Sequence, residues 1–428
     1  MSLSQFLGQL GTKPNSKTLS RLFNLDPATN KFIVGIYNDT RDFNSLKQQV
    51  NQVEFYDGGW PAFDQVVFSF VRLCSQLDPN SLVMSFDLYA QFLSDVSVAF
   101  TNLGNGALIA SVIAPTVDTV VPMARKLDQQ LKNYEADAVY PRLTFLASVL
   151  LRVFNHIRSQ LGDNTPEAKQ SLLLYVSNKL CFIYNQIGNP LLCQNVFSNI
   201  TTANLKFSQF PAADQLQYRF YLAKFYLIKH HLVDAYRHFS WCVERCSARE
   251  RERVLKYLVP LGMMLGRSPN FNGITRQAGA VSWLPVYRDI AGAVSAGNYA
   301  GFVEAVTRHE AYLKQMGLLV LVRSKLEVVL FRNLLRQVWK IQGQASTLTY
   351  GAIQNALRLS WGAYAPEGGV DALVVENMVV SLVDQNLLRG KLVSSVSKVA
   401  VASSNVFPEI SGIYTQKFGG AGDKWMDD

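Results

Sequence analysis

The sequence is poor in the residues from which catalytic and metal sites are most often built. It has five histidines among 428 residues, and its five cysteines are scattered without one CxxC pair. Such cysteine usage is typical of a reduced intracellular compartment and not of a disulfide framework. We therefore expect no disulfide scaffold.

The few motifs that hint at metal chemistry are incomplete. His238, Cys242 and Cys246 follow one another at i, i+4 and i+8, which suits zinc geometrically, but no fourth ligand is apparent. Small buried residues at helix contacts explain the three better. The pair at 309–310 begins like HExxH, but position 313 is leucine, so the second ligand is missing.

A glycine-rich run at 419–425 lacks the loop spacing and the Ser or Thr of a P-loop. No Ser-His-Asp or Cys-His set is suggested either. We therefore expect a protein that is not an enzyme and that needs no metal and no cofactor.

The chain also lacks an unbroken membrane span and a secretory signal. Its most apolar window, GALIASVIAPTVDTVVPMA, is interrupted by Pro115, Asp118 and Pro122, which a lipid-exposed helix centre tolerates poorly. The opening MSLSQFLGQLGTKPNSK has no basic stretch followed by an apolar core. These features favour a soluble protein without a membrane partner.

Acidic residues are fewer than basic ones. There are 41 Lys and Arg against 32 Asp and Glu, which gives a net charge of +9 and a pI near 9.2. This balance favours an acidic partner, either nucleic acid or an acidic protein. With 49% hydrophobic and 17% charged residues the chain is globular, and its length allows two or three domains.

Helical periodicity dominates from residue 62 to about residue 340. The stretch from Asp214 shows two apolar stripes separated by a break at 229–231, which predicts two helices joined tightly as an antiparallel pair. The stripes are Tyr218, Tyr221, Leu222 and Phe225, then Ala235, Phe239, Cys242 and Val243. Stacking such pairs buries their apolar faces, so we expect a right-handed helical-repeat superhelix.

The segment 344–408 has a different pattern of expected secondary structure. A helix is expected from Leu348 to Trp361 with Thr349 as its cap, and a second helix starts after Asp371. The period then changes to two in LLRGKLV, residues 394–397 can turn the chain, and KVAVA returns as a second strand. Helix, helix and hairpin predict a winged helix.

The expected organisation has five parts. They are a poorly readable N-terminal segment (1–60), an N-terminal helical region (61–213), a helical-repeat part (214–343), a winged helix (344–408) and a flexible C-terminal tail (409–428). The fold class is all-α: a TPR-like superhelix ending in a winged-helix subdomain.

A helical array that runs directly into a winged helix resembles the PCI domain. The words SAGNYAGFVEAVTRHEAYLKQMG, LFRNLLRQVW and LLRGKL with a later NVFP are similar to one subgroup. Upstream, SLLLYVSNKLCFIYNQIGNPLLCQNVFSNI and RVLKYLVPLGMMLGRSP are similar to it too. That subgroup is the PCI subunit of the nuclear transcription-and-export complex (TREX-two), related to a signalosome-associated subunit, and the resemblance covers about Leu143 to Pro408.

The resemblance implies a nuclear mRNA-export factor at the nuclear envelope or pore. It implies that the winged helix pairs with a large PCI-like scaffold subunit, that a very small acidic subunit shared with the proteasome lid braces the assembly, and that a basic surface meets RNA or DNA. A purely structural PCI subunit of a signalosome-like or proteasome-lid-like assembly, without nucleic-acid contact, remains the alternative.

The candidate nucleic-acid residues lie on the last long helix. Lys325, Arg332, Arg336 and Lys340 fall at spacings of seven, four and four, within an arc of about 80° on one helix face. Such a stripe suits phosphates, and a solvated helix back is the competing interpretation. Arg389, Lys391 and Lys398 extend the stripe onto the wing, where edge protection explains them equally well.

The second helix of the winged region, ALVVENMVVSLVDQN, is apolar and acidic, so reading of bases is not indicated. Contact with single-stranded backbone fits better. Trp339, Tyr350 and Trp361 are aromatic candidates for stacking, although core packing is the commoner role. The partner interface is expected on apolar wing residues, namely Leu388, Leu392, Val399 and Val401.

Overall fold

The structure is a computed structural model that describes residues 2–39, 48–50, 52–78, 80–134, 139–162, 165–203, 205–278, 281–419 and 423–427. It divides into two compact units, Met1–Tyr221 with Gly422–Asp428, and Leu222–Ala421. From the sequence alone the corresponding boundary was placed at 213, eight residues earlier than the division at Tyr221. Helix α12 (Ala212–Ile228) supplies residues to both units.

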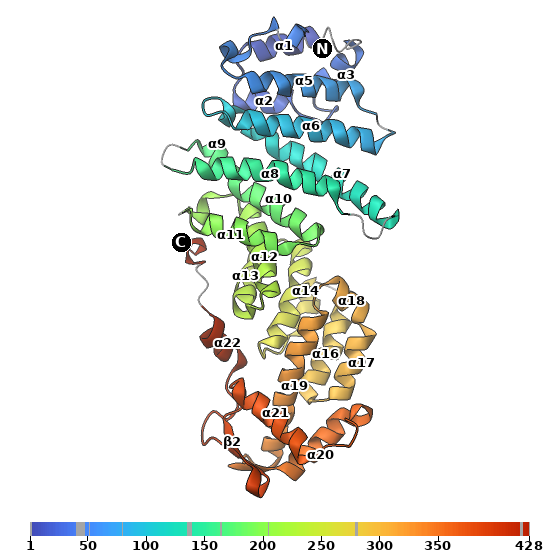
Figure 1. Ribbon diagram of the computed structural model, residues 1–428, viewed down its shortest axis with the longest axis vertical. Helices are drawn as coiled ribbons and strands as arrows, with labels where there is room; N and C mark the ends of the chain where they lie inside the picture. The colour runs from blue at the N-terminus through green and yellow to red at the C-terminus, as the bar shows by residue number, and fades with distance from the viewer. Residues whose placement is uncertain are drawn as a thin grey trace. The chain divides into compact units, whose positions relative to one another are not determined.

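The first unit is a stack of helices in which each long helix packs on its neighbours in the chain (Figure 1). Contacts run from α5 to α6, α6 to α7, α7 to α8 and α8 to α10. The helices are α1 (Leu3–Gly11), α2 (Ser16–Leu22), α3 (Phe32–Asp39), α5 (Pro61–Gln76), α6 (Leu82–Phe100), α7 (Ala110–Tyr134), α8 (Pro141–Ser159), α9 (Glu167–Gln170), α10 (Leu172–Gln186) and α11 (Cys193–Thr201).

The segment 1–60 was left uninterpreted from the sequence, and its described residues fold onto this stack through phenylalanines. The rings of Phe6 and Phe70 stack at 5.5 Å, and Phe23 meets Phe70 edge-on at 5.1 Å. Phe6 and Phe70 are fully buried, and Phe23 nearly so. Aromatic burial of this size dominates a local core, so α1 to α3 are integral to the first unit.

Helix α7 carries the most apolar window of the chain. With the preceding turn it forms Gly106–Tyr134, a helix long and apolar enough by length and composition to cross a membrane; its most apolar window of 18 residues has a mean hydropathy of 1.7. Half of that window is buried inside the protein, and Ile113, Val117 and Val120 are fully buried. Core packing therefore accounts for the buried half of this apolar window.

The second unit begins within α12, the first helix of the predicted antiparallel pair, and continues into the winged helix (Figure 1). The predicted break at 229–231 is confirmed: α12 ends at Ile228, His230 adopts a left-handed φ of 62°, and α13 follows. The helices are α13 (Leu232–Arg245), α14 (Ala248–Met264), α15 (Phe271–Ala278), α16 (Leu284–Ala296), α17 (Tyr299–Arg308), α18 (Glu310–Gln315), α19 (Leu319–Ile341), α20 (Tyr350–Trp361), α21 (Ala372–Asp384) and α22 (Ile410–Phe418).

Helix α19 is the central element of this unit, because α14, α16, α17 and α20 all pack against it. Gly297 ends α16 with a left-handed φ of 64°, and a Cβ at this position would lie 2.9 Å from the Cα of Leu334. Only glycine allows this approach. The close contact places α16 directly beside the C-terminal half of α19.

The winged helix forms as predicted, with one additional strand. Thr349 caps α20 by accepting a hydrogen bond from the Ala352 amide, and Asp371 caps α21 by accepting from the Val374 amide at 2.8 Å. The sheet contains β1 (Thr347–Thr349), β2 (Gly390–Val393) and β3 (Lys398–Val401), all antiparallel in the order β1-β3-β2. Strand β1 falls where the sequence predicted the start of a helix, which begins at Tyr350 instead.

The segment 409–428 was expected to be flexible, but its described residues are folded. Helix α22 packs against α13, and residues 424–426 form a short 3-10 turn. The predicted all-α class is confirmed, since the described residues contain three short strands beside the helices listed above.

Candidate nucleic-acid interface

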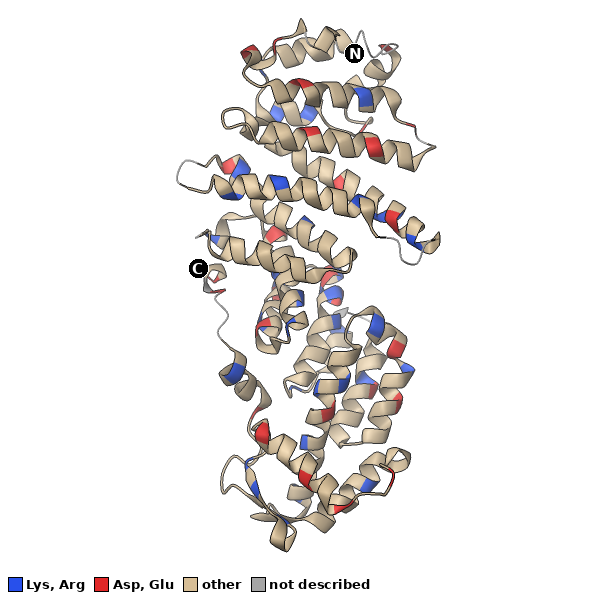
Figure 2. Ribbon diagram, viewed as in Figure 1, with Lys and Arg blue, Asp and Glu red and all other residues tan. Residues whose placement is uncertain are grey.

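A groove of about 550 Å³ opens on the second unit where α14, α16 and α19 meet. The end of α14 and the turn after it form one wall, α16 forms the next, and the C-terminal half of α19 forms the third. Its lining is rich in cations (Lys and Arg are blue in Figure 2), and among the described residues no Asp or Glu lines it. The cations are Arg267, Arg288, Arg332, Arg336 and Lys340, and we call this site the basic groove.

Four of these cations are exposed, namely Arg267, Arg288, Arg336 and Lys340. Within the described part of the chain, none of the four forms an ion pair with a carboxylate. Their charges are therefore not neutralised by ion pairs among the described residues. A concave surface lined by charge of one sign raises the local concentration of counter-ions, so the basic groove is suited to a polyanion.

Aromatic rings orient two of the exposed arginines. The guanidinium of Arg267 lies 4.6 Å from the ring centroid of Tyr236 and donates to its hydroxyl at 3.4 Å. The guanidinium of Arg288 lies 5.7 Å from the ring of Phe271. Contacts of this kind hold a planar guanidinium in place while they leave its edge able to donate hydrogen bonds.

Arg332 lies at the floor of the groove and is 7% exposed. Its guanidinium donates to the carbonyl oxygens of Pro408 at 2.8 Å and of Phe407 at 3.1 Å. Burial, and then the nearby charge of Arg336, lower the pKa of Arg332 to about 10. The predicted exposed stripe is therefore corrected at this position: Arg332 is a buried residue that holds the chain after the wing.

Lys325 is also separated from the other members of the stripe. Its Nζ lies 5.9 Å from the ring centroid of Tyr414 on α22, and it borders a small cavity beside that helix instead of the basic groove. All four cations of the predicted stripe do lie on one helix, α19. The segment 407–418 covers this face of the helix at Lys325 and Arg332, which leaves Arg336 and Lys340 at the surface.

The structure adds two cations that the sequence did not single out. Arg267 follows α14 and Arg288 lies on α16, and both reach the groove only because these helices pack beside α19. For Arg267 the sequence carries one signal, because no Asp or Glu lies between Glu252 and Asp289. Arg288 precedes Asp289, which instead pairs with Arg308 and His309.

Two of the three predicted wing cations lie on one face of the sheet. Lys391 is paired with Ala400, and Lys398 with Val393. Directly paired residues share a face, as do residues two apart on one strand. Lys391 and Lys398 therefore lie on the same side of the sheet, and both are exposed, as is Arg389 just before β2.

The four apolar residues expected at a partner interface do not form a surface. Val399 is fully buried and Leu388 is 1% exposed, so both belong to the core of the winged helix. Leu392 and Val401 are half-buried. Exposed apolar side chains occur elsewhere in this subdomain, with Leu359 85%, Leu373 60% and Val380 51% exposed.

The aromatic candidates are held by neighbours within the unit. Trp339 donates to the carbonyl of Ala345 at 3.1 Å, and Tyr350 donates to Glu376 at 3.0 Å. Trp361 meets the rings of Tyr299 and Phe331 edge-on. Packing accounts for all three.

The residues weighed as metal ligands also have other contacts. His238 stacks on Tyr226 with ring centroids 5.7 Å apart, and Cys246 donates to the carbonyl of Val243 at 3.7 Å. His309 contacts Asp289 through Nε2 at 3.0 Å. The glycine-rich run at 419–425 lies partly outside the described residues.

A helical array packed around one long helix and closed by a winged helix is the architecture of a PCI domain, as the sequence predicted. No family model matches the chain. It is 26% identical over 376 residues to the nuclear mRNA export protein THP1 of Saccharomyces cerevisiae. The aligned residues cover 80% of this chain and 81% of that protein.

Two further relatives carry PCI domains by name. A PCI domain-containing protein of Schizosaccharomyces pombe is 22% identical over 426 residues, 95% of this chain and 94% of that protein. PCI domain-containing protein 2 of Xenopus laevis is 25% identical over 293 residues, 68% of this chain and 70% of that protein. The predicted resemblance to PCI-domain export proteins is thereby confirmed.

Proposed function

We propose that this protein is a non-enzymatic PCI scaffold subunit of a nuclear mRNA-export assembly that holds nucleic-acid backbone in the basic groove. The observation that carries the nucleic-acid part is the composition of the groove, with four exposed cations and, among the described residues, no carboxylate. Similarity to a nuclear mRNA export protein over 80% of the chain supports the proposed role in mRNA export.

The chemistry of the groove suits phosphates more than bases. Arginine presents donors that match phosphate oxygens, while contacts of this kind position a strand without reading its sequence. Helix α21, the second helix of the winged region, offers mainly apolar and acidic residues, which does not suit base recognition in a major groove. We therefore propose single-stranded RNA or DNA bound through its backbone.

The proposed partners are a large PCI-like scaffold subunit and a very small acidic subunit, in a nuclear hetero-oligomer at the envelope or pore. Exposed Leu359, Leu373 and Val380 support pairing through the winged helix, because exposed apolar residues of this size favour burial against a partner. The net charge of +9 supports an acidic component.

The test is the salt dependence of single-strand binding by the full chain, alone and in its assembled complex. For single strands the logarithm of affinity falls with the logarithm of salt by about 0.7 per neutralised phosphate, so three or four contacts predict a slope of about −2 to −3. The variant R336A/K340A removes two exposed cations and is expected to flatten the slope by roughly 1 to 2 units. Unrelated sequences should lose affinity equally.

The matched control is R125A/K126A, which removes two exposed charges from α7, far along the chain from the groove. Arg332 is left intact in both variants because its loss would disturb the segment that it holds. If R336A/K340A and R125A/K126A weaken binding equally, the groove is not the binding site. If neither the free chain nor the complex shows salt-dependent binding, the purely structural PCI subunit is the better description.

A further inference from the structure

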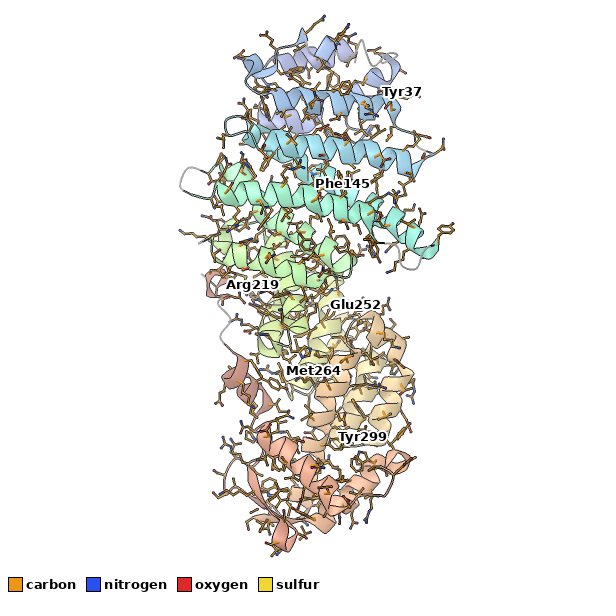
Figure 3. The ribbon with its side chains drawn as sticks, in the orientation of Figure 1. Tyr37, Phe145, Arg219, Glu252, Met264 and Tyr299 are labelled. Atoms are coloured by element: carbon orange, nitrogen blue, oxygen red, sulfur yellow. The ribbon has the colours of Figure 1, made fainter. Side chains whose placement is uncertain are left out.

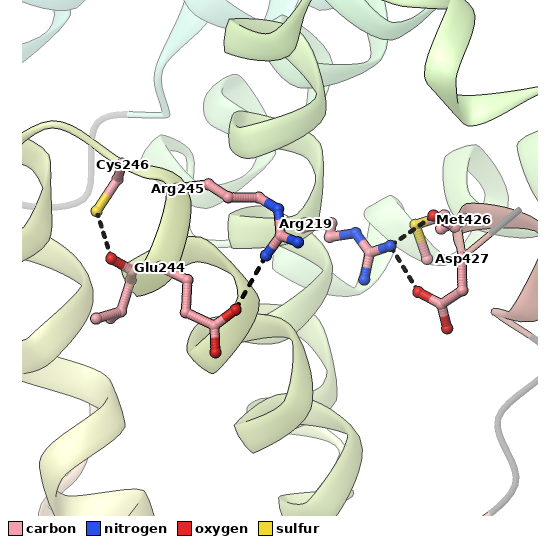
Figure 4. Close-up of polar contacts among 7 residues, drawn as sticks. Arg219, Glu244, Arg245, Cys246, Met426 and Asp427 are labelled. Carbon is pink, nitrogen blue, oxygen red and sulfur yellow. Dashed lines mark hydrogen bonds and ion pairs between the residues drawn. The ribbon is translucent and has the colours of Figure 1, made fainter.

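The first unit contains a cradle that is filled by residues from the far end of the sequence. The cradle consists of Phe207, in a short 3-10 turn, and of Tyr218 and Arg219 on α12. The segment 423–427, which we call the tail segment, lies against these side chains. Figure 3 labels Arg219 on its helix, and Figure 4 shows its contacts with the tail segment.

Arg219 forms hydrogen bonds with two successive residues of the tail segment. Its Nη2 donates to the main-chain carbonyl of Met426 at 2.7 Å and to the carboxylate of Asp427 at 2.8 Å (Figure 4). The Arg219 side chain is 2% exposed, whereas that of Asp427 is 53% exposed. A buried cation thus recognises one carbonyl and one carboxylate that approach from the surface.

Trp425 supplies the apolar part of the contact. Its ring meets Phe207 edge-on at 5.3 Å and Tyr218 at 6.0 Å. The guanidinium of Arg219 lies 5.2 Å from the ring of Phe207, so one aromatic ring borders both the cation and the indole. Met426 is 5% exposed beside them.

This arrangement has the features of a peptide-recognition site. An aromatic anchor enters a pocket, and a charged residue of the receptor fixes the register by bonding the peptide backbone and a carboxylate two residues after the anchor. In the sequence, residues 419–422 (Gly-Gly-Ala-Gly) stand between Phe418 and the tail segment.

We propose that Phe207, Tyr218 and Arg219 form a binding site for short peptides with an aromatic residue followed two positions later by a carboxylate. The resident ligand is the chain's own tail segment, which binds in cis and leaves the cradle as one unit. A tethered ligand acts at an effective concentration in the millimolar range. The cis ligand therefore excludes peptides of the same chemistry unless they bind tightly.

The test uses the full chain and a labelled peptide of residues 419–428. The variant W425A/D427A vacates the cradle without altering its walls, and fluorescence anisotropy should show it binding the peptide at least tenfold more tightly than the wild-type chain does. Adding R219Q to that variant should abolish the gain. A peptide with W425A is the matched control and should not bind.

The proposal is overturned if the folded variant W425A/D427A fails to bind the peptide, or if it and the wild-type chain bind equally. Circular dichroism establishes that the variant is folded. A variant that fails to fold would show that the tail segment is an obligatory part of the first unit and not an exchangeable ligand, which overturns the proposal as well.

Discussion

Lys169 is a buried cation without a carboxylate partner among the described residues. Its side chain is 1% exposed, and Nζ contacts the carbonyl of Asn102 at 3.1 Å, Nε2 of His156 at 3.0 Å and Oε1 of Gln160 at 3.1 Å. The ring of Phe100 lies 5.1 Å away. Because the ammonium group can only donate, His156 must accept and therefore be neutral here.

This cluster predicts that the first unit loses stability in mild acid. Burial, and then the charge of Lys169, lower the pKa of His156 below its ordinary value of 6.5. The unfolded chain therefore binds the proton more readily than the folded chain does, so the free energy of unfolding falls as pH drops below about 6.5. Urea unfolding between pH 5 and pH 8 measures this dependence.

The control for this prediction is H156Q, which keeps a hydrogen-bond acceptor that does not titrate. The difference in unfolding free energy between pH 8 and pH 5 should be smaller in H156Q than in the wild-type chain. The other four histidines contribute equally to both proteins and cancel in the comparison. Identical pH dependences would contradict the assigned role of His156.

At the scale of the single element, helix α21 depends on its N-terminal cap. Asp371 has an extended backbone, and its carboxylate accepts from the amide of Val374 at 2.8 Å. Replacing Asp371 by alanine leaves this amide without its partner and is expected to lower the free energy of unfolding by about 1 kcal/mol. D371N should retain most of the stability, since asparagine caps equally well.

Chemical denaturation of the two variants measures the difference. Equal destabilisation by D371A and D371N would show that the charge, through the helix dipole, matters more than the hydrogen bond. Because the cap lies in the winged helix and outside the basic groove, neither variant should change the salt slope of nucleic-acid binding.

At the scale of the whole molecule, the winged helix leaves apolar side chains uncovered. Leu373 and Val380 lie seven residues apart on α21, so they share a helix face, and both are more than half exposed. We expect L373E/V380E to abolish co-purification of a scaffold subunit, because burying two carboxylates at an interface is strongly unfavourable. Nucleic-acid binding by the free chain should remain.

The matched control is V83E/V98E, which places two carboxylates at exposed valines of α6. This variant should assemble like the wild-type chain. If both variants assemble normally, the exposed face of α21 is not the partner surface.

Much of this protein was determined by local sequence. Apolar spacing predicted the helices, Thr349 and Asp371 were identified as caps, and the change of period to two at LLRGKLV located the hairpin. Each of these signals acts within one or two turns of chain, where neighbouring residues are necessarily close in space. The resemblance to PCI-domain proteins could be recognised for the same reason, because it consists of short motifs that follow one another along the sequence.

The tertiary structure alone decided which charges face solvent and which surfaces form sites. Arg332 and Arg336 are four residues apart on one helix, yet the first is buried under residues 407–408 and the second is exposed in the basic groove. Arg267 and Arg288 join that groove through helix packing, and the tail segment reaches Arg219 across more than 200 positions of sequence. Periodicity specifies the direction of a side chain from its own helix, but what covers it depends on segments far away in the chain.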